Sequence, residues 1–313
     1  MIPTPPFEFP PEQQALRGRA RQLAWFSIAL LASAAVFLAL TLGQSQAMKT
    51  AWISDLLSII PPVALLVAMR FEMRPPSRRF PYGYTRAVSI AFLVTASALT
   101  LFGVILFTDA VVKLVRGERP PIGMLVLFGH ELWAAWSMIA ALTYSMGCGM
   151  LVGHLKLPVA RKLHDKELEA EAQMNRDEWL SEGVAIIGLL LVGYGFWWGD
   201  AVSAAIVAIQ IVRDGFHNVR QVVGDLMDEA PSVMSTHDLE DLPDKVQAAA
   251  ERLDWVARAS VRLREHGRAI VGEVFVVPRD STDLVARLED AAARLREVDW
   301  RLHALSVTPV SRL

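Results

Sequence analysis

Long apolar runs dominate this chain and limit what it can fold into. A helix needs about 20 consecutive apolar residues to cross the hydrocarbon core of a bilayer. Such windows lie at residues 24–43, 51–69, 88–112, 125–148, 180–197 and 200–217. Only 20% of the 313 residues are charged, which is less than a soluble domain of this size usually carries. We therefore expect an α-helical membrane protein with six transmembrane helices.

Basic residues orient the expected helices. One set precedes the first window or joins windows two to three and four to five: Arg17, Arg19, Arg21, Arg70, Arg74, Arg78, Arg79, Arg86, Lys156, Arg161, Lys162, Lys166 and Arg176. The opposite side carries fewer: Lys49, Lys113, Arg116 and Arg119. Positive residues gather on the cytoplasmic side of a membrane, so we expect both chain ends in the cytoplasm and the helices in the cytoplasmic (inner) membrane. The first window lacks the features of a cleaved signal peptide and is expected to remain as an anchor.

The remainder of the chain has the composition of a soluble domain. Residues 236–253 and 281–298 have the pattern of amphipathic helices, and residues 255–265, 268–277 and 301–310 that of strands. The dipeptide "HG" between the first two strands indicates a hairpin turn. The expected order is αββαβ, a small α+β domain of about 80 residues. Its hydrophobic core is too small to make the domain very stable alone. We therefore expect a homodimer.

Several functional classes find no support. No glycine-rich phosphate loop, GxSxG elbow or HExxH motif occurs, so nothing indicates a nucleotide-driven pump or an enzyme. The net charge of −2 argues against nucleic acid as a partner. The single cysteine, Cys148, provides neither an intramolecular disulfide nor a thiolate cluster. We expect no bound cofactor.

A charged residue inside a membrane span is a functional candidate because it costs about 2.5–3.5 kcal/mol to insert. Asp55 lies in the second window, and Ser58 follows it on the same helical face. Pro61 and Pro62 should kink that helix. The alternative for Asp55 is a boundary residue that reaches the outer surface.

The stretch "EAQMNRDEWLSEG", residues 171–183, precedes the fifth window. Met174, Asn175 and Glu178 can converge on one helical face, whereas Asp177 is rotated by about 100° from Glu178. The alternative is a solvated helix start, where acids favour the positive end of the helix dipole. Asp200 opens the sixth window, where capping is the expected role.

Two motifs and the tail together resemble a known family. These are "FPYGYTRAVSIAFL" entering the third window, "WGDAVSAAIVAIQIVRDGFHNVRQVVGDLMDEAP" at and after the sixth, and the αββαβ tail. They resemble the cation diffusion facilitator family over roughly residues 24–310. The resemblance implies a dimeric, proton-coupled exporter of divalent metals with a ferredoxin-like cytoplasmic domain. The implied domains are a cytoplasmic segment at 1–23, a six-helix membrane domain at 24–217 and the ferredoxin-like domain at 218–313.

The family's transport site uses two pairs of ligands spaced i, i+4, one pair in span two and one in span five. The resemblance places the first pair on Ala51 and Asp55, so one ligand is missing. It places the second on Met174 and Glu178, or, in a register shifted by one, on Gln173 and Asp177. The candidate metal ligands are therefore Asp55, Met174, Asn175, Asp177 and Glu178.

The tail departs from the family as well. Ser260, Val307 and Pro309 occupy positions where the resemblance implies metal ligands. We therefore expect no metal in the tail and a dimer held by packing alone.

The donor set indicates which cation is carried. A zinc site prefers histidine nitrogen together with carboxylate or thiolate, whereas a set of oxygen donors suits Mn²⁺ or Fe²⁺, and a thioether disfavours Mg²⁺ and Ca²⁺. We expect a proton-linked exporter of Fe²⁺ or Mn²⁺, with Zn²⁺ less favoured. The proton would bind Asp55 or Glu178 once the cation has left. The missing ligands leave open a second interpretation, a membrane scaffold or metal sensor that has lost transport.

Overall fold

The computed structural model describes residues 10–72, 74, 77–81, 83–84, 86–119, 122–127, 130–233, 238–266 and 269–313. Residues 1–9 of the expected N-terminal segment, Tyr82 of the quoted motif and Gly267 of the expected hairpin turn lie outside these ranges. The chain divides into two compact units. One comprises residues 16–68 and 90–222, and the other residues 1–15, 69–89 and 223–313.

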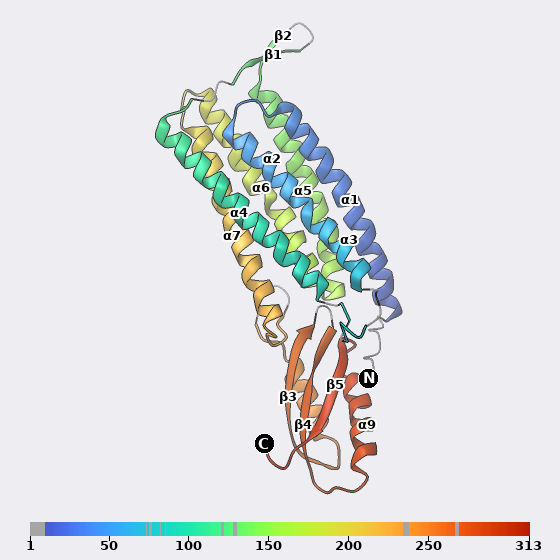
Figure 1. Ribbon diagram of the computed structural model, residues 1–313. Helices are drawn as coiled ribbons and strands as arrows, with labels where there is room; N and C mark the ends of the chain where they lie inside the picture. The colour runs from blue at the N-terminus through green and yellow to red at the C-terminus, as the bar shows by residue number, and fades with distance from the viewer. Residues whose placement is uncertain are drawn as a thin grey trace. The chain divides into compact units, whose positions relative to one another are not determined.

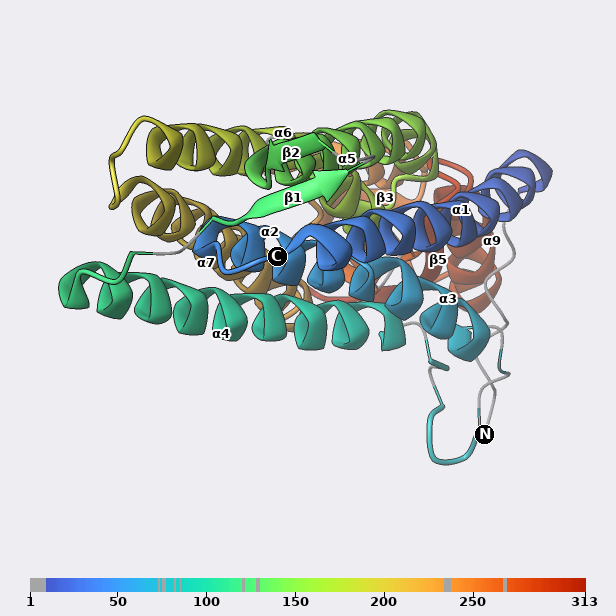
Figure 2. The ribbon, with the colours of Figure 1, turned by 90° about the horizontal axis from the view of Figure 1, so that it is seen from above.

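Long helices that run side by side form the first unit (Figures 1 and 2). They are α1 (Pro11–Thr41), α2 (Gln46–Ser58), α3 (Ile60–Glu72), α4 (Ala87–Arg116), α5 (Ala135–Leu163), α6 (Lys166–Gly193) and α7 (Gly199–Leu226). Within the described residues, four segments are long and apolar enough to cross a membrane: α1, Gln46–Phe71 (α2 with α3), α4 and α5. The chain is therefore a multi-pass membrane protein.

The second span is broken where its prolines predict. α2 ends at Ser58 and α3 begins at Ile60, so the interruption falls at Ile59, just before Pro61 and Pro62. The Ile59 N–H bonds to the carbonyls of the preceding turn. Proline lacks an N–H and its ring displaces the carbonyl four residues earlier, which accounts for the break.

The start expected for the fourth span, residue 125, is wrong. Strand β1 (Met124–Leu127) pairs antiparallel with β2 (His130–Trp133), and α5 begins only at Ala135. The hairpin lies beyond the ends of the helices in Figure 1. Mean hydropathy over a window measures how apolar a segment is, but not whether its apolar residues repeat with the period of a helix or of a strand. The apolar window therefore included this hairpin together with the helix that follows it.

The loop expected between the fourth and fifth spans is a two-residue connection. α5 runs to Leu163 and α6 begins at Lys166. His164 adopts a left-handed conformation with φ 51°, and the Asp165 side chain accepts a 3.0 Å hydrogen bond from the N–H of Leu168, which caps α6. The basic residues assigned to this loop therefore lie on helices, and one of them, Lys156, is fully buried.

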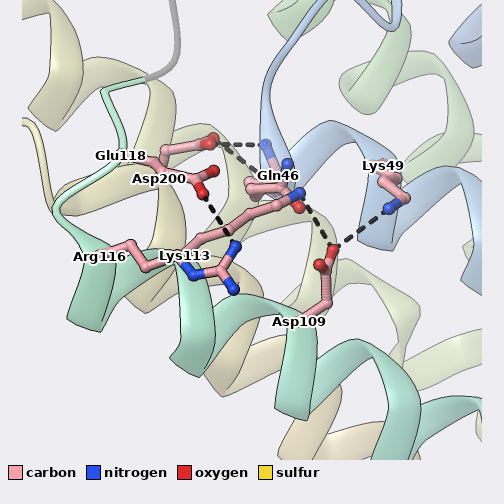
Figure 3. A network of polar contacts seen from close by, with 8 residues as sticks. Gln46, Lys49, Asp109, Lys113, Arg116, Glu118 and Asp200 are labelled. Atoms are coloured by element: carbon pink, nitrogen blue, oxygen red, sulfur yellow. Dashed lines mark hydrogen bonds and ion pairs between the residues drawn. The ribbon is translucent and has the colours of Figure 1, made fainter.

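Asp200 is a helix cap, but for a different helix from the one that contains it. Its buried carboxylate accepts hydrogen bonds from the N–H groups of Gln46 and Ala47 and from the Ser45 hydroxyl, all at the start of α2. Figure 3 shows Asp200 directed at Gln46, with Asp109 of α4 between Lys49 and Lys113 nearby. A carboxylate at a helix N-terminus satisfies free N–H groups and complements the helix dipole.

The second unit contains the small sheet domain. Its elements are α8 (Leu242–Glu251), β3 (Val256–His266), β4 (Ala269–Pro278), α9 (Leu284–Arg296) and β5 (Leu302–Pro309). The order αββαβ is as predicted. β4 is central, antiparallel to β3 and parallel to β5, and in its register Val274 pairs with Val261 and Val307. Side chains from both helices and all three strands form one apolar core, which includes Val246, Val274 and Leu295.

Candidate metal site among three helices

A stripe of polar residues runs along one face of α6. Glu171, Asn175, Glu178 and Glu182 are spaced by four, three and four residues, which places them on the same side of a helix. Their exposed fractions are 3%, 0%, 8% and 3%, so the whole stripe is buried. The interpretation of these residues as a solvated helix start is therefore wrong for all four.

Small residues of α5 let that helix approach the stripe closely. Ser145, Gly149 and Gly153 recur every four residues on α5. A Cβ atom on Gly149 would lie 2.4 Å from Glu178 Oε2, and one on Gly153 would lie 2.6 Å from the backbone oxygen of Ala172. Small residues at this spacing allow helix backbones to pack tightly in membranes. The contact between α5 and α6 thus encloses the acids.

Two serines hold the central carboxylates. Asp55 of α2 is 1% exposed, and the Ser145 hydroxyl of α5 donates a 2.5 Å hydrogen bond to its Oδ2. Ser58 of α2 donates a 2.6 Å hydrogen bond to Glu178 Oε1. Glu182, which is 3% exposed, interacts with both Asp55 and Ser145. The packing of α2 and α6 with α5 therefore brings the carboxyl groups of Asp55, Glu178 and Glu182 into one buried cluster.

Several polar atoms of this cluster are unsatisfied within the described part of the chain. They are both amide atoms of Asn175, Glu178 Oε2 and Glu182 Oε2. A buried polar atom without a hydrogen bond costs about 1–3 kcal/mol, and native proteins contain few of them. Their concentration on one stripe indicates a place that a ligand or protons complete.

The cluster is not a closed metal cage as it stands. Among the described residues, no group of three or more His, Cys, Asp or Glu side chains is arranged to hold a metal ion. In this arrangement the serine hydroxyls occupy one oxygen each of Asp55 and Glu178. Glu178 Oε2 and Glu182 Oε2 have no hydrogen-bond partner in the described part of the chain, so carboxylate oxygens remain for a cation beside the serine contacts.

The structure separates the predicted ligands. It brings Asp55, Asn175 and Glu178 into or beside the cluster. Met174 packs against the apolar cluster around Leu57 and Leu99 and borders a small cavity. Asp177 is half exposed and pairs with Arg176 at 3.4 Å. The role of these residues as metal ligands stays a prediction.

The family's ligand pairs, matched to this sequence, assign no role to Glu182 or Ser145. Glu182 follows Glu178 by four residues, so helical periodicity alone could have placed it on the same face. Ser145 carried no comparable signal, because its importance depends on how α5 packs against α2. Glu171 opens the stretch for which a solvated helix start was the alternative, and it is instead buried against Lys156 of α5.

Comparison with known proteins adds an independent finding. The profile of the cation efflux transmembrane domain family matches residues 23–227. The manganese efflux system protein MneS of Bacillus subtilis is 23% identical over 297 residues, which cover 94% of each chain. The cation-efflux pump FieF of Yersinia pestis is 24% identical over 214 residues, covering 62% of this chain and 66% of the relative.

A third similarity covers a shorter part of the chain. An uncharacterized transporter of Methanocaldococcus jannaschii is 27% identical over 165 residues, covering 52% of this chain. The chain spans about half the length of that relative, 54%. The region that matches the family profile includes α2, α5 and α6, and therefore the buried carboxylate cluster.

Proposed function

Because the chain belongs to the cation diffusion facilitator family, we propose that it exports a divalent transition-metal cation in exchange for protons, across the cytoplasmic membrane. The family is a family of transporters. Export of divalent cations follows from the family, whereas the metal, the coupling ion and the membrane are our proposals.

We place six helices in the membrane, with both chain ends in the cytoplasm. α6 and α7 have 28 residues each, a length of about 42 Å, which exceeds the hydrocarbon thickness of about 30 Å. Their charged residues lower their hydropathy, but the acids of the α6 stripe are buried against α2 and α5. The clusters of basic residues at Arg17–Arg21 and Arg70–Arg86 support the cytoplasmic side.

The observation that carries the proposal is the buried cluster of Asp55, Glu178 and Glu182. Three negative charges cannot remain together in a buried site without compensation. A divalent cation supplies two positive charges at once, and protons supply the same compensation after the cation leaves. Alternating occupancy of one cluster by a cation or by protons is the simplest basis for coupling the two.

The donors of the cluster favour Mn²⁺ or Fe²⁺ over Zn²⁺. Carboxylate oxygens from Asp55, Glu178 and Glu182 and the amide oxygen of Asn175 form an oxygen set, and zinc sites use histidine or thiolate more often. A relative with 94% coverage is named as a manganese efflux protein, which supports Mn²⁺ as the first metal to test.

The test is Mn²⁺ transport by the purified full chain in vesicles under a pH gradient. We expect Asp55→Asn and Glu178→Gln each to reduce transport at least about tenfold, because each removes a charge without changing the shape of the side chain. Asp177→Asn is the matched control, since it removes a carboxylate of α6 that is half exposed and pairs with Arg176. Transport by both cluster variants at the wild-type rate would refute the assignment.

A scaffold or sensor without transport is the second candidate. Ala51 and Met174 stand where the family resemblance places ligands, and this observation favours it. Calorimetry in detergent separates a transporter from a scaffold. A transporter should release heat with Mn²⁺ that Asp55→Asn abolishes, whereas a scaffold should release none that depends on Asp55.

We also propose that the working unit is a homodimer. The small αββαβ domain has a limited core of its own, and a second copy would bury further apolar surface. Mass photometry in detergent tests this directly, and a monomer mass at all concentrations would contradict it.

A further inference from the structure

Helices α2 and α6 pass the buried cluster in opposite directions, and two contacts fix how they are aligned. The Ser58 hydroxyl donates a 2.6 Å hydrogen bond to Glu178 Oε1. One turn earlier on α2, Asp55 interacts with Glu182, which lies one turn later on α6. The residue of α6 that stands level with Asp55 is therefore Glu182.

The two positions at which the family resemblance places further ligands lie in apolar surroundings. Ala51, one turn before Asp55, is 1% exposed and belongs to an apolar cluster that includes Ala185 of α6. Met174 packs against a second apolar cluster, formed by α2, α4 and α7. It also lies eight residues before Glu182, which is about 12 Å along the helix axis. Neither position therefore adds a donor to the carboxylate cluster.

Glu178 and Glu182 form an i, i+4 pair of their own, one turn later in α6 than the pair at positions 174 and 178. Both residues are buried, with exposed fractions of 8% and 3%. The Oε2 atom of each has no hydrogen-bond partner in the described part of the chain. A buried polar atom without a partner costs about 1–3 kcal/mol, so two such oxygens on neighbouring turns indicate a place for a ligand.

We propose that the ligand pair of span five has moved by one helical turn in this chain, so that Glu182 replaces Met174 and determines which cation is selected. The cation then lies between Asp55 of α2 and the Glu178–Glu182 pair of α6. With a carboxylate at each of these positions, the site favours Mn²⁺ over Zn²⁺. The inference rests on the proposed function, because it concerns the same cluster.

Histidine substitution at the two positions tests which of them faces the cation. Mn²⁺ bound to the full chain in detergent is counted by electron paramagnetic resonance, and Zn²⁺ is added as a competitor that releases it. We expect Glu182→His to shift the preference toward Zn²⁺ by about tenfold or more, because imidazole suits zinc. Met174→His should leave the preference unchanged, because its ring would lie among apolar side chains away from the cluster.

A second pair of variants conserves side-chain volume and so disturbs folding little. Glu182→Gln removes a charge but keeps polar atoms for Ser145 and Asp55, and we expect it to weaken Mn²⁺ binding about tenfold or more. Met174→Leu removes the thioether and should leave Mn²⁺ binding unchanged. Thermal unfolding of each variant in detergent checks that it is folded. A purely structural role of Glu182 predicts instead that Glu182→Gln binds Mn²⁺ as wild type does.

Three results would overturn the inference. They are wild-type Mn²⁺ binding by Glu182→Gln, an unchanged metal preference in Glu182→His, and a shift toward Zn²⁺ in Met174→His as large as that in Glu182→His. The proposed function is judged separately, because it fails if Asp55→Asn and Glu178→Gln transport like wild type. If those two variants lose transport while Glu182→Gln binds Mn²⁺ normally, the function stands and only the relocated ligand pair is rejected.

Discussion

The Ser58 hydroxyl of α2 donates a 2.6 Å hydrogen bond to Glu178 Oε1 of α6, between residues 120 positions apart in the chain. Ser58 is the last residue of α2 before the break at Ile59. Its hydroxyl also lies 3.1 Å from the carbonyl oxygen of Ser54, a second acceptor. The proline break of the second span therefore begins at the residue that bonds to a carboxylate of the candidate site, and the Ser58 hydroxyl has a second acceptor on its own helix.

Substitution of Ser58 by alanine should lower the stability of the cation-free protein by about 1 kcal/mol, because Glu178 loses its hydrogen bond. With Mn²⁺ bound the difference should shrink, since the cation replaces the hydroxyl as partner. The measurement is thermal unfolding in detergent with and without Mn²⁺. Thr143→Ala is the control, because this hydroxyl of α5 is exposed and bonds only to the carbonyl of Ile139. Equal Mn²⁺-induced shifts in wild type and Ser58→Ala would contradict the exchange of partners.

Three glycines of α5 should respond differently to alanine. Gly147 has nothing within 4 Å of the added Cβ, so Gly147→Ala should stabilise the helix by about 0.5–1 kcal/mol. On Gly153 the Cβ would meet backbone atoms of Ala172 and Arg176 at 2.6 and 2.7 Å, which cannot move without separating the helices. Gly153→Ala should therefore destabilise the protein by about 1–3 kcal/mol.

Gly149→Ala should affect transport more than stability. The atom nearest to its Cβ is Glu178 Oε2 at 2.4 Å, the end of a flexible side chain, although the Asn175 carbonyl oxygen at 3.0 Å is also close. The carboxylate must turn, and transport should fall by more than the loss of folded protein explains. Thermal unfolding and vesicle uptake on the three variants check both expectations. Equal transport by the Gly147 and Gly149 variants would contradict the position assigned to Glu178.

The local part of this architecture was predictable from periodicity. Asn175 and Glu178 share a face because they are three residues apart on a helix, and the proline break follows from the chemistry of Pro61 and Pro62. The αββαβ order followed from alternating apolar residues and turn signals. These features depend on neighbours in sequence, where a single chain carries enough information.

Features that depend on packing between distant segments were not predictable in the same way. The first turns of α6 were assigned to a solvated loop because they carry charged residues. Glu171 is instead paired with Lys156, and this pair forms only because α5 packs against α6. Asp200 was assigned to its own helix, although its acceptor oxygens face the start of α2. Burial of acids in a membrane protein is decided by what the neighbouring helices offer.

Asp200→Ala should destabilise the helical unit by about 1–2 kcal/mol or more, because it removes the acceptor for the N–H groups of Gln46 and Ala47 and for Ser45. Asp109→Ala is the matched control. Its side chain is 33% exposed and pairs with two lysines near the surface, so its loss should change stability by only about 0–1 kcal/mol. Thermal unfolding in detergent measures both, and similar losses from the two variants would contradict the capping role of Asp200.

The sheet domain contains a charged cluster around His266 at the end of β3. Arg86 Nε donates a 3.2 Å hydrogen bond to His266 Nδ1, and Arg86 also pairs with Asp228, which in turn pairs with Arg264 at 2.6 Å. Burial, followed by the positive charges of Arg86 and Arg264 and by His303, lowers the pKa of His266 to about 4, against the opposing charge of Asp228. The imidazole therefore stays neutral in the folded domain.

This pKa shift predicts a loss of stability in acid. An unfolded histidine has a pKa of about 6.5, so between pH 6.5 and about 4 the unfolded chain binds the proton that the folded domain resists. The contribution of His266 is complete above pH 6.5 and is lost as the pH falls through that window. Asp228 acts in the same direction at lower pH, because Arg86 and Arg264 outweigh burial and lower its pKa.

Hydrogen exchange of the β3 and β4 amides in the full chain, corrected for the intrinsic rates, measures this effect. In wild type, protection of these strands should decrease as the pH falls from 7 to 4.5. His266→Gln keeps an acceptor for Arg86 but cannot bind a proton in this range, so its decrease should be smaller. His154→Gln, an exposed histidine of α5, is the control and should follow wild type. If His266→Gln loses protection as steeply as wild type, the acid sensitivity of the sheet belongs to other groups.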